Sequence, residues 1–152
     1  MYGPGEVPGR YRNVIPNFFY WAMSGHALPI TGDGTETRDW TYVDDIVGGL
    51  LAMGIKEEAI GEAINLGSGM EQRVVDMARR VNDIAGNEAG IEYTERRDWD
   101  AKTRLLSSIE KAKRLLDYKP QMEFEDGLTN VHEWFARNWE DVVKSAEFQV
   151  SR

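Results

Sequence analysis

The sequence contains no cysteine among its 152 residues. Disulfides, thiolate catalysis and cysteine-ligated metals are therefore excluded, and the composition fits a reducing cytoplasm. No apolar run approaches the roughly 18 residues that cross a bilayer, and no signal peptide is visible. We therefore expect a cytoplasmic protein with no membrane partner.

Positive charge is also scarce in this sequence. Lys and Arg together number 18 against 26 Asp and Glu, a formal net charge of −8. Nucleic acids and anionic membranes require a broad basic face, so neither is an expected partner. An anionic small molecule stays compatible with the composition if cations gather locally. Four cations share one irregular stretch, as an anion site or as a solvated charge run: Arg96, Arg97, Lys102 and Arg104.

Motifs of metalloenzymes and hydrolases are missing. His26 and His132 have no partner at metal-ligand spacing, so each is expected to be a surface or half-buried side chain. No Gly-x-Ser-x-Gly elbow and no His-Glu-x-x-His motif occurs. Gly67-Ser68-Gly69 could open a dinucleotide loop, but its third glycine position holds Gln72, which favours a plain turn. We expect no metal site and no catalytic residue in this chain.

The order of elements predicts an α/β chain, rich in helix and with a few short strands. Strands are expected at 28–31, 38–43, 62–66 and 91–95. Such short, widely spaced strands make an unconvincing sheet on their own, and some are expected to extend a sheet that lies elsewhere. Residues 1–12 are expected to form a loop, 13–140 one domain and 141–152 a flexible tail.

Helices are predicted from apolar periodicity and from terminal signals. The first starts after an Asn13 cap and ends before Gly25, and the second is capped by Asp44 or Asp45. The third ends at Gly86. Ser107 to Glu110 reads as a capping box for a helix that closes near Asp117. A last helix carries one apolar stripe: Phe124, Leu128, Val131, Phe135 and Trp139.

Arg38 stands out because it follows a glycine turn, "GDG", at the start of a predicted strand. Its guanidinium presents a rigid fork of donors that matches a phosphate bidentately. A surface ion pair with Glu36 or Asp39 is the simpler alternative. The cationic stretch around Arg97 favours an anion, because a second cationic loop could close on it from the opposite side.

The ordered motifs "YGPGEVPGRYRN", "GDGTETRDWTYVDD", "AINLGSG" and "SSIEKAKRLLDYKP" resemble the second half of NAD-dependent nucleotide-sugar epimerases and dehydratases. These enzymes are extended short-chain dehydrogenases/reductases, typified by UDP-glucose 4-epimerase. The resemblance runs from Tyr2 to about Trp139. It implies the helix-rich, substrate-binding C-terminal part of such an enzyme, without the Rossmann core and with residues 1–12 left from the half that precedes it.

The resemblance implies roles for particular residues. Arg38 would bind the pyrophosphate of the nucleotide sugar, and Arg97 would be the second phosphate or ribose contact, with Arg104 as its competitor. Backbone at Asn13, Val14 and Ile15 and the strand edge at Pro29 and Thr31 would hold the base. Tyr2, Gly3 and Pro4 would lie at the nicotinamide end of NAD.

The two motifs on which the family's chemistry depends are missing from these 152 residues. No Gly-x-x-Gly-x-x-Gly loop occurs, and none of the six tyrosines is followed four residues later by lysine. We therefore expect the chain to be catalytically silent alone and not to bind NAD tightly. Its partners would be a nucleotide sugar, a separate Rossmann half and a second copy in a homodimer. The alternative is a non-enzymatic assembly module that docks on an NAD-binding chain or on itself.

Overall fold

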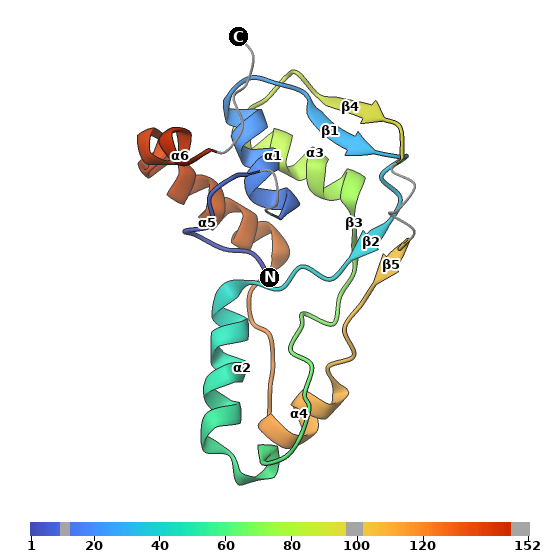
Figure 1. The fold of residues 1–152 in the computed structure, drawn as a ribbon, viewed down its shortest axis with the longest axis vertical. Coiled ribbons are helices and arrows are strands. Elements are labelled where there is room, and N and C mark those ends of the chain that lie inside the picture. The colour runs from blue at the N-terminus through green and yellow to red at the C-terminus, as the bar shows by residue number, and fades with distance from the viewer. Residues whose placement is uncertain (10–12, 97–101, 147–152) are drawn as a thin grey trace.

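The computed structural model describes residues 1–9, 13–96 and 102–146, and they form two lobes (Figure 1). The upper lobe holds helices α1 (Val14–Met23), α3 (Val74–Ala85), α5 (Phe124–Arg137) and α6 (Trp139–Ser145). The lower lobe holds α2 (Val43–Ile55), α4 (Glu110–Leu116) and the short 3-10 helix η1 (Glu57–Ala59).

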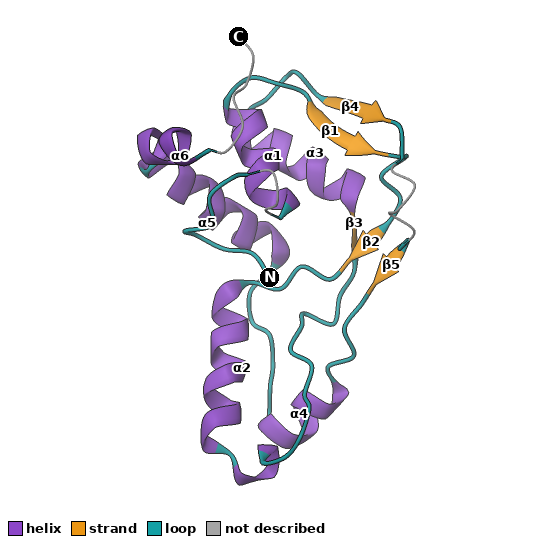
Figure 2. Cartoon of the chain, viewed as in Figure 1, coloured by secondary structure: helices purple, strands orange, loops and turns teal. Residues whose placement is uncertain are grey.

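The strands form two small sheets along one side of the molecule (Figure 2). In the first, β1 (Leu28–Thr31) pairs in parallel with β4 (Ile91–Thr94). In the second, the order is β3 (Gln72–Arg73), β2 (Thr37–Arg38), β5 (Arg104–Leu105). There β2 runs antiparallel to β3 and parallel to β5. The predicted class, α/β with much helix and few short strands, is confirmed.

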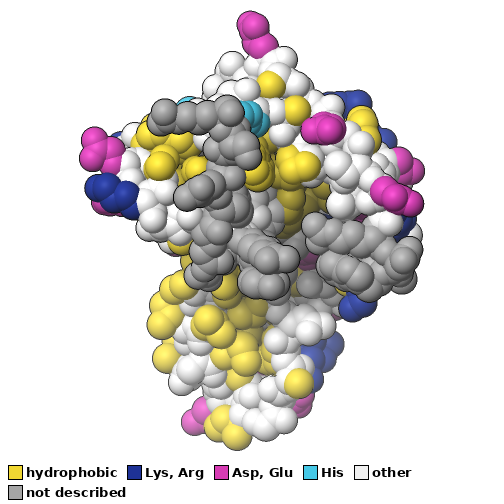
Figure 3. Space-filling view, turned by 45° about the horizontal axis from the view of Figure 1, so that its top comes forward, with side chains coloured by type: hydrophobic (Ala, Val, Ile, Leu, Met, Phe, Trp, Pro, Cys, Tyr) yellow, Lys and Arg dark blue, Asp and Glu magenta, His cyan; other side chains and the backbone are white. Residues whose placement is uncertain are grey.

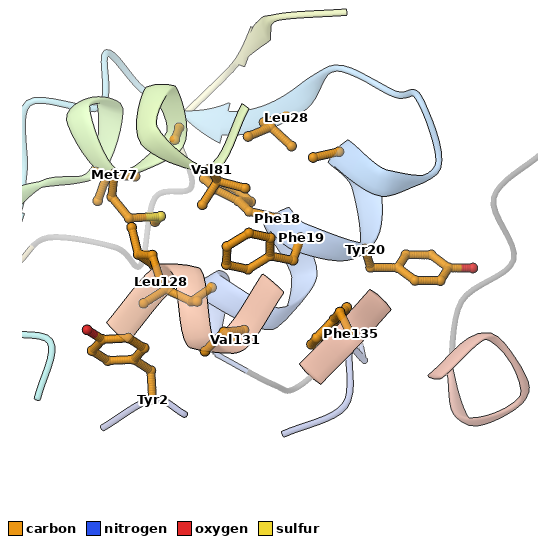
Figure 4. Close-up of a cluster of buried hydrophobic side chains, with 14 of the residues drawn as sticks. Tyr2, Phe18, Phe19, Tyr20, Leu28, Met77, Val81, Leu128, Val131 and Phe135 are labelled. Atoms are coloured by element: carbon orange, nitrogen blue, oxygen red, sulfur yellow. The ribbon is translucent and has the colours of Figure 1, made fainter. Parts of the chain in front are cut away.

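The main core lies where α1, α3 and α5 pack together (Figure 4). Phe19 and Phe135 are fully buried and their ring centroids are 6.0 Å apart. Met77, Leu128 and Val131 complete the contact between the helices. A second, smaller cluster holds the lower lobe together, and five buried side chains form it: Ala59, Ile109, Ala112, Leu116 and Tyr118.

Two predicted helix caps are wrong. α2 starts at Val43, with Tyr42 at the N-cap position, so Asp44 and Asp45 lie inside its first turn. Asp45 instead accepts hydrogen bonds from the backbone N–H groups of residues 121 and 122. Ser107 does not cap α4, whose N-cap position is Ile109 without a side-chain bond. In both cases the predicted capping residue binds a distant segment instead. Asp45 accepts from Gln121 N, and Ser107 N donates to Asp39.

Two predicted strands also differ from the structure. The observed strand is Thr37–Arg38, so Arg38 alone of the stretch predicted at 38–43 lies in it, and Tyr42 makes an isolated bridge to Tyr2. Residues 62–66 form no strand. Strand assignment needs a hydrogen-bonded neighbour, and periodicity cannot supply one. The glycine signals held: Gly25 and Gly86 end α1 and α3 with positive φ.

The predicted last helix is split in two. α5 ends at Arg137, Asn138 interrupts it, and α6 continues to Ser145 with Val142 buried in the core. Ordered helix thus extends past the boundary expected at residue 140. Residues 147–152 lie outside the described part of the chain, so the tail and the other domain boundaries stay predictions.

Candidate functional site

Arg38 lies on β2, the central strand of the three-stranded sheet. Backbone bonds on either side of it fix the register, from Thr37 N to Thr103 O at 2.9 Å and from Asp39 N to Leu105 O at 2.8 Å. The half-buried guanidinium donates through Nη1 to Thr37 O at 2.9 Å and through Nη2 to Lys102 O at 3.1 Å. The Arg38 head group therefore contacts the backbone of Lys102, which belongs to the cationic stretch named above.

Arg104 lies on the neighbouring strand but on the other face of this sheet. Thr37 and Arg104 are register partners, whereas Arg38 is the partner of Leu105. Because paired residues share a face and successive residues alternate, the two guanidinium groups start from opposite faces. Arg38 and Arg104 therefore lie on adjacent strands, whose backbones are about 4.8 Å apart. Their side chains leave from opposite faces of the sheet.

Glu71 engages Arg104. Its carboxylate accepts from Arg104 Nε at 2.8 Å and from Nη2 at 3.0 Å, and it also accepts from the Thr37 hydroxyl at 2.8 Å. These hydrogen bonds lower the pKa of Glu71, and the bond from Arg104 has the larger effect. The same bond raises the pKa of Arg104. This ion pair ties β5 to the turn before β3.

Arg97 lies outside the described residues, but the residues on both sides of the gap are placed. The Arg96 side chain lies over Gly32, within 3.7 Å of the point where a Cβ there would sit. Gly32 has a φ of +76° and ends β1. On the other side, the Lys102 carbonyl accepts from Arg38. The described residues on either side of the gap, Arg96 and Lys102, therefore lie at the turn after β1 and at the Arg38 head group.

The β1 edge offers backbone groups at Pro29 and Thr31. Leu28 N donates to Gly90 O and Gly32 N donates to Thr94 O, both at 2.9 Å. Backbone groups of successive residues alternate between the two edges of a strand, so those of Pro29 and Thr31 face away from β4. No third strand covers that edge among the residues described. The carbonyl of Pro29 and the N–H and carbonyl of Thr31 suit the planar edge of a nucleobase, since proline itself has no N–H to donate.

The first turn of α1 holds Asn13, Val14 and Ile15. Asn13 is exposed and donates through Nδ2 to Glu6 Oε1 at 2.7 Å. Val14 is half-buried, whereas Ile15 is 1% exposed and belongs to the main core. A ligand can therefore meet the surfaces of Asn13 and Val14, while the Ile15 side chain packs inward.

Tyr2 and Gly3 have structural surroundings that the sequence did not reveal. Tyr2 is 2% exposed and its hydroxyl donates to Phe124 O at 3.3 Å. Its ring meets the rings of Tyr42 and Phe124 edge-on, and burial raises its pKa. A Cβ on Gly3 would lie 2.4 Å from Val43 Cγ1. Both residues pack into the protein, and of the three predicted cofactor contacts only Pro4 is exposed.

Sequence reasoning considered Asp39 only as an ion-pair partner of Arg38 and missed its contacts with the glycine turn. Its carboxylate accepts from Ser68 N at 3.0 Å, Ser68 Oγ at 2.6 Å, Gly69 N at 3.1 Å and Ser107 N at 3.3 Å. A Cβ on Gly67 would lie 2.7 Å from Asp39 Oδ2. The glycine turn is thus closed on a carboxylate, which agrees with the plain turn that Gln72 favoured. The position of Asp39 directly after Arg38 was the available signal in the sequence. Its hydrogen-bond partners lie too far along the chain to be predicted from residue spacing.

The part of the chain that the structure describes was searched for a metal-binding cluster and for a helix that could span a membrane. The described residues contain no cluster of His, Asp or Glu that could hold a metal ion. His26 and His132 are half-buried, as predicted, against the rings of Trp21 and Phe19. None of the helices described is long and apolar enough to cross a bilayer.

Comparison with known proteins gives consistent matches. The family model described as GDP-mannose 4,6 dehydratase matches residues 2–131. The solved epimerase of Methanothermobacter thermautotrophicus is 68% identical with a TM-score of 0.95, and the match covers 97% of this chain and 44% of that one. The UDP-glucose 4-epimerase of Thermotoga maritima, solved with UDP-glucose, is 29% identical with a TM-score of 0.84, covering 91% and 43%.

Sequence relatives agree with these structures. The dTDP-glucose 4,6-dehydratase 1 of Escherichia coli is 34% identical over 157 residues, which cover 97% of this chain and 42% of that enzyme. The chain thus spans less than half the length of these relatives. Since the family match extends over most of the sequence, the chain belongs to the NAD-dependent nucleotide-sugar epimerases and dehydratases, of the extended short-chain dehydrogenase/reductase type.

Proposed function

We propose that this chain is the nucleotide-sugar-binding part of an NAD-dependent sugar epimerase or dehydratase, with a UDP-sugar as its ligand. The observation that carries the proposal is the position of Arg38. It lies on the central strand of a sheet, inside the family match, with its head group at the cationic segment. Solved relatives support the ligand class, since one is described with UDP-glucose and another with UDP-glucuronic acid and NAD.

Arg38 binds the diphosphate through charge-assisted hydrogen bonds in this proposal. Its fork of donors spans two phosphate oxygens. A hydrogen bond to a charged group contributes about 1.5–3 kcal/mol. Two cations therefore supply little more than the roughly 4.1 kcal/mol of a millimolar complex. We expect weak binding by this chain alone, in the high micromolar to millimolar range.

Arg97 is the second phosphate contact in this proposal, in preference to Arg104. The Arg104 guanidinium is held by Glu71 on the sheet face opposite Arg38. Arg97 belongs to the segment whose ends lie at Gly32 and at the Arg38 head group. In this proposal Arg97 contacts the same diphosphate as Arg38.

The nucleobase lies along the free edge of β1 in this proposal. Backbone groups of Pro29 and Thr31 point to that edge. Paired donors and acceptors on a strand edge recognise a planar amide-like ring by its edge. Asn13 and Val14 supply exposed surface at the start of α1.

In this proposal NAD is held elsewhere than at Tyr2 and Gly3. Tyr2 and Gly3 are packed against Phe124 and Val43, and the sequence lacks both the glycine loop and the Tyr-x-x-x-Lys pair. A solved relative, WbmF of Bordetella bronchiseptica, is described in complex with NAD+ and UDP. We propose that NAD and the proton-transfer groups belong to a part of the parent enzyme outside this chain, so that the chain alone catalyses nothing.

Isothermal titration calorimetry of the chain with UDP and UDP-glucose tests the proposal. Arg38→Ala should abolish the heat of binding, whereas Arg104→Ala, changed on the opposite face, should weaken it less than threefold, about 0.7 kcal/mol or less. Binding of UDP that is unaffected by Arg38→Ala would contradict the assigned site. Epimerisation by the purified chain would contradict the proposal that the chain alone has no catalytic activity.

A second function, in the class of assembly modules, is favoured by the exposed apolar face of α2. In that case the arginines bind nothing small, and the chain docks on an NAD-binding chain or on itself. Size-exclusion chromatography with light scattering separates the two functions when it is combined with the calorimetry. Stable complexes without any heat of UDP binding would favour the assembly module.

A further inference from the structure

Glu71 contacts two neighbouring strands at once from the turn before β3. Its carboxylate accepts from the Arg104 guanidinium of β5, through Nε at 2.8 Å and Nη2 at 3.0 Å. It also accepts from the Thr37 hydroxyl of β2 at 2.8 Å. The Glu71 side chain is 31% exposed, so solvent screens these contacts only in part. One side chain therefore joins three segments that are far apart in the sequence.

The same two strands supply carbonyl groups that hold the Arg38 guanidinium. Nη1 donates to Thr37 O of β2 at 2.9 Å, and Nη2 donates at 3.1 Å to Lys102 O, on the segment that leads into β5. Two bonds from different nitrogens of one planar group fix both its plane and its direction. The direction of the Arg38 fork therefore depends on how β2 and β5 lie relative to each other.

Backbone pairing alone gives β2 and β5 a weak connection. Each strand is only two residues long, Thr37–Arg38 and Arg104–Leu105, and pairing of so few residues is marginal in water. Thr37 and Arg104 are register partners, so the Glu71 carboxylate links the strands at one rung of this short ladder. We therefore expect the side-chain link to have a large share in fixing the relative position of the two strands.

The link lies on the face of the sheet opposite the proposed diphosphate. Thr37 and Arg104 share one face, and Arg38, one residue further along β2, starts from the other. Glu71 can therefore orient the Arg38 guanidinium without contacting a ligand that Arg38 binds.

We propose that Glu71 is a positioning residue for Arg38. By binding Thr37 and Arg104, its carboxylate holds β2 and β5 in the register that directs the Arg38 guanidinium toward the diphosphate. The inference rests on the proposed function, in which Arg38 binds a nucleotide sugar. It also gives Arg104 a role other than ligand contact, since its guanidinium holds the Glu71 carboxylate.

The negative charge of Glu71 makes the sign of the effect informative. Figure 3 shows acidic and basic side chains together along the side of the molecule where Figure 1 places the strands. Coulomb's law alone predicts that removing a carboxylate near an anion site tightens anion binding. Positioning predicts the opposite, because a guanidinium without a fixed direction must be ordered when the ligand binds. Glu71→Gln separates the two effects, since glutamine keeps the shape of the side chain without its charge.

Titration of the purified chain with UDP, followed by NMR, suits the weak affinity expected. Glu71→Gln should raise the Kd about fivefold, because both links are weakened. Thr37→Val and Arg104→Ala each remove one link and should raise the Kd about twofold. Glu88→Gln is the matched control, since it removes an exposed carboxylate, and it should change the Kd by less than about 1.5-fold.

The arginine side-chain signals provide a second measurement, made without nucleotide. Restricted rotation keeps the Nη–H signals of a held guanidinium separate, whereas fast rotation merges them. The Arg38 signals are assigned by their loss in Arg38→Lys. We expect them to be separate in the unsubstituted chain and in Glu88→Gln, and to merge in Glu71→Gln.

Either unchanged Arg38 signals or tighter UDP binding in a folded Glu71→Gln variant would overturn the positioning role. If that variant does not fold, Thr37→Val tests the same two expectations with one link removed. A chain that binds no UDP, but whose Arg38 signals merge in Glu71→Gln, would contradict the proposed function and support the action of Glu71 on Arg38. The two failures are therefore distinguishable.

Discussion

The Asp39 carboxylate accepts two hydrogen bonds from Ser68, at 3.0 Å from the backbone nitrogen and 2.6 Å from the hydroxyl. Together with the bonds from Gly69 N and Ser107 N, this contact joins the end of β2 to the glycine turn and to the loop before α4. The residue that follows the proposed diphosphate ligand therefore connects the three-stranded sheet to the lower lobe.

Asp39→Ala should lower the free energy of unfolding by about 1.5–3 kcal/mol, because several backbone donors lose a charged acceptor. Urea denaturation measures the loss. Asp83→Ala, on the exposed side of α3, serves as the control and should stay within about 0.5 kcal/mol. Equal stability of the two variants would mean that water replaces the Asp39 carboxylate without cost.

Gly67→Ala should destabilise the fold by about 1–3 kcal/mol. Its new Cβ would meet Ser107 Cβ at 2.6 Å and Asp39 Oδ2 at 2.7 Å, so one of the three segments must move. Gly54→Ala is the matched comparison, since nothing lies within 4 Å of a Cβ there. In the helix α2 that change should raise stability by about 0.4–1 kcal/mol. Thermal unfolding should shift in opposite directions for the two variants.

Glu71 should make the fold sensitive to acid. Its pKa is lowered in the fold by hydrogen bonds from Arg104 and Thr37. A lowered folded-state pKa contributes stability that is present above the ordinary Glu pKa of about 4.3 and is lost as the pH falls through the folded value. Glu71→Gln should therefore flatten the fall in urea midpoint below about pH 4.5, whereas the surface change Glu88→Gln should leave the profile unchanged. An unaltered profile in Glu71→Gln would contradict the ion pair.

Tyr118 should act at the alkaline end. Burial raises its pKa to about 12, and its hydroxyl donates to Gly67 O at 3.0 Å. Because the fold favours the neutral phenol, this stability is fully present below the ordinary tyrosine pKa of 10.0 and declines as the pH rises toward about 12. Tyr118→Phe should cost about 0.5–1.5 kcal/mol at neutral pH. It should also reduce the loss of stability at alkaline pH. Urea midpoints at successive pH values measure this loss, and Tyr93→Phe, at an exposed tyrosine, is the control.

Local signals predicted much of the fold correctly. The apolar stripe of Phe124, Leu128, Val131 and Phe135 predicted the buried face of α5, and Gly86 marked the end of α3. Helical periodicity is written within a few turns, so it survives without knowledge of neighbours. The caps at Asp45 and Ser107 were wrong because each side chain or backbone group found a partner far along the chain.

The candidate site was only partly readable. Arg38 was singled out by its place after a glycine turn, but the face on which Arg104 lies depends on the register between β2 and β5. A shift of one residue would exchange the faces, and the sequence contains no turn that links these strands directly. Tyr2 could not be recognised as a core residue, because its partners Tyr42 and Phe124 come from two distant segments.

By itself, the sequence determined the α/β class, the three core helices and the family. Periodicity, glycine positions and an ordered series of motifs can all be recognised in the linear sequence without knowledge of tertiary contacts. Only the tertiary structure decided that Arg104 starts from the sheet face opposite Arg38, which groups the Asp39 carboxylate binds, and that Leu66 packs on α2. Those facts depend on strand register and on contacts between distant segments, which chain folding alone brings into reach.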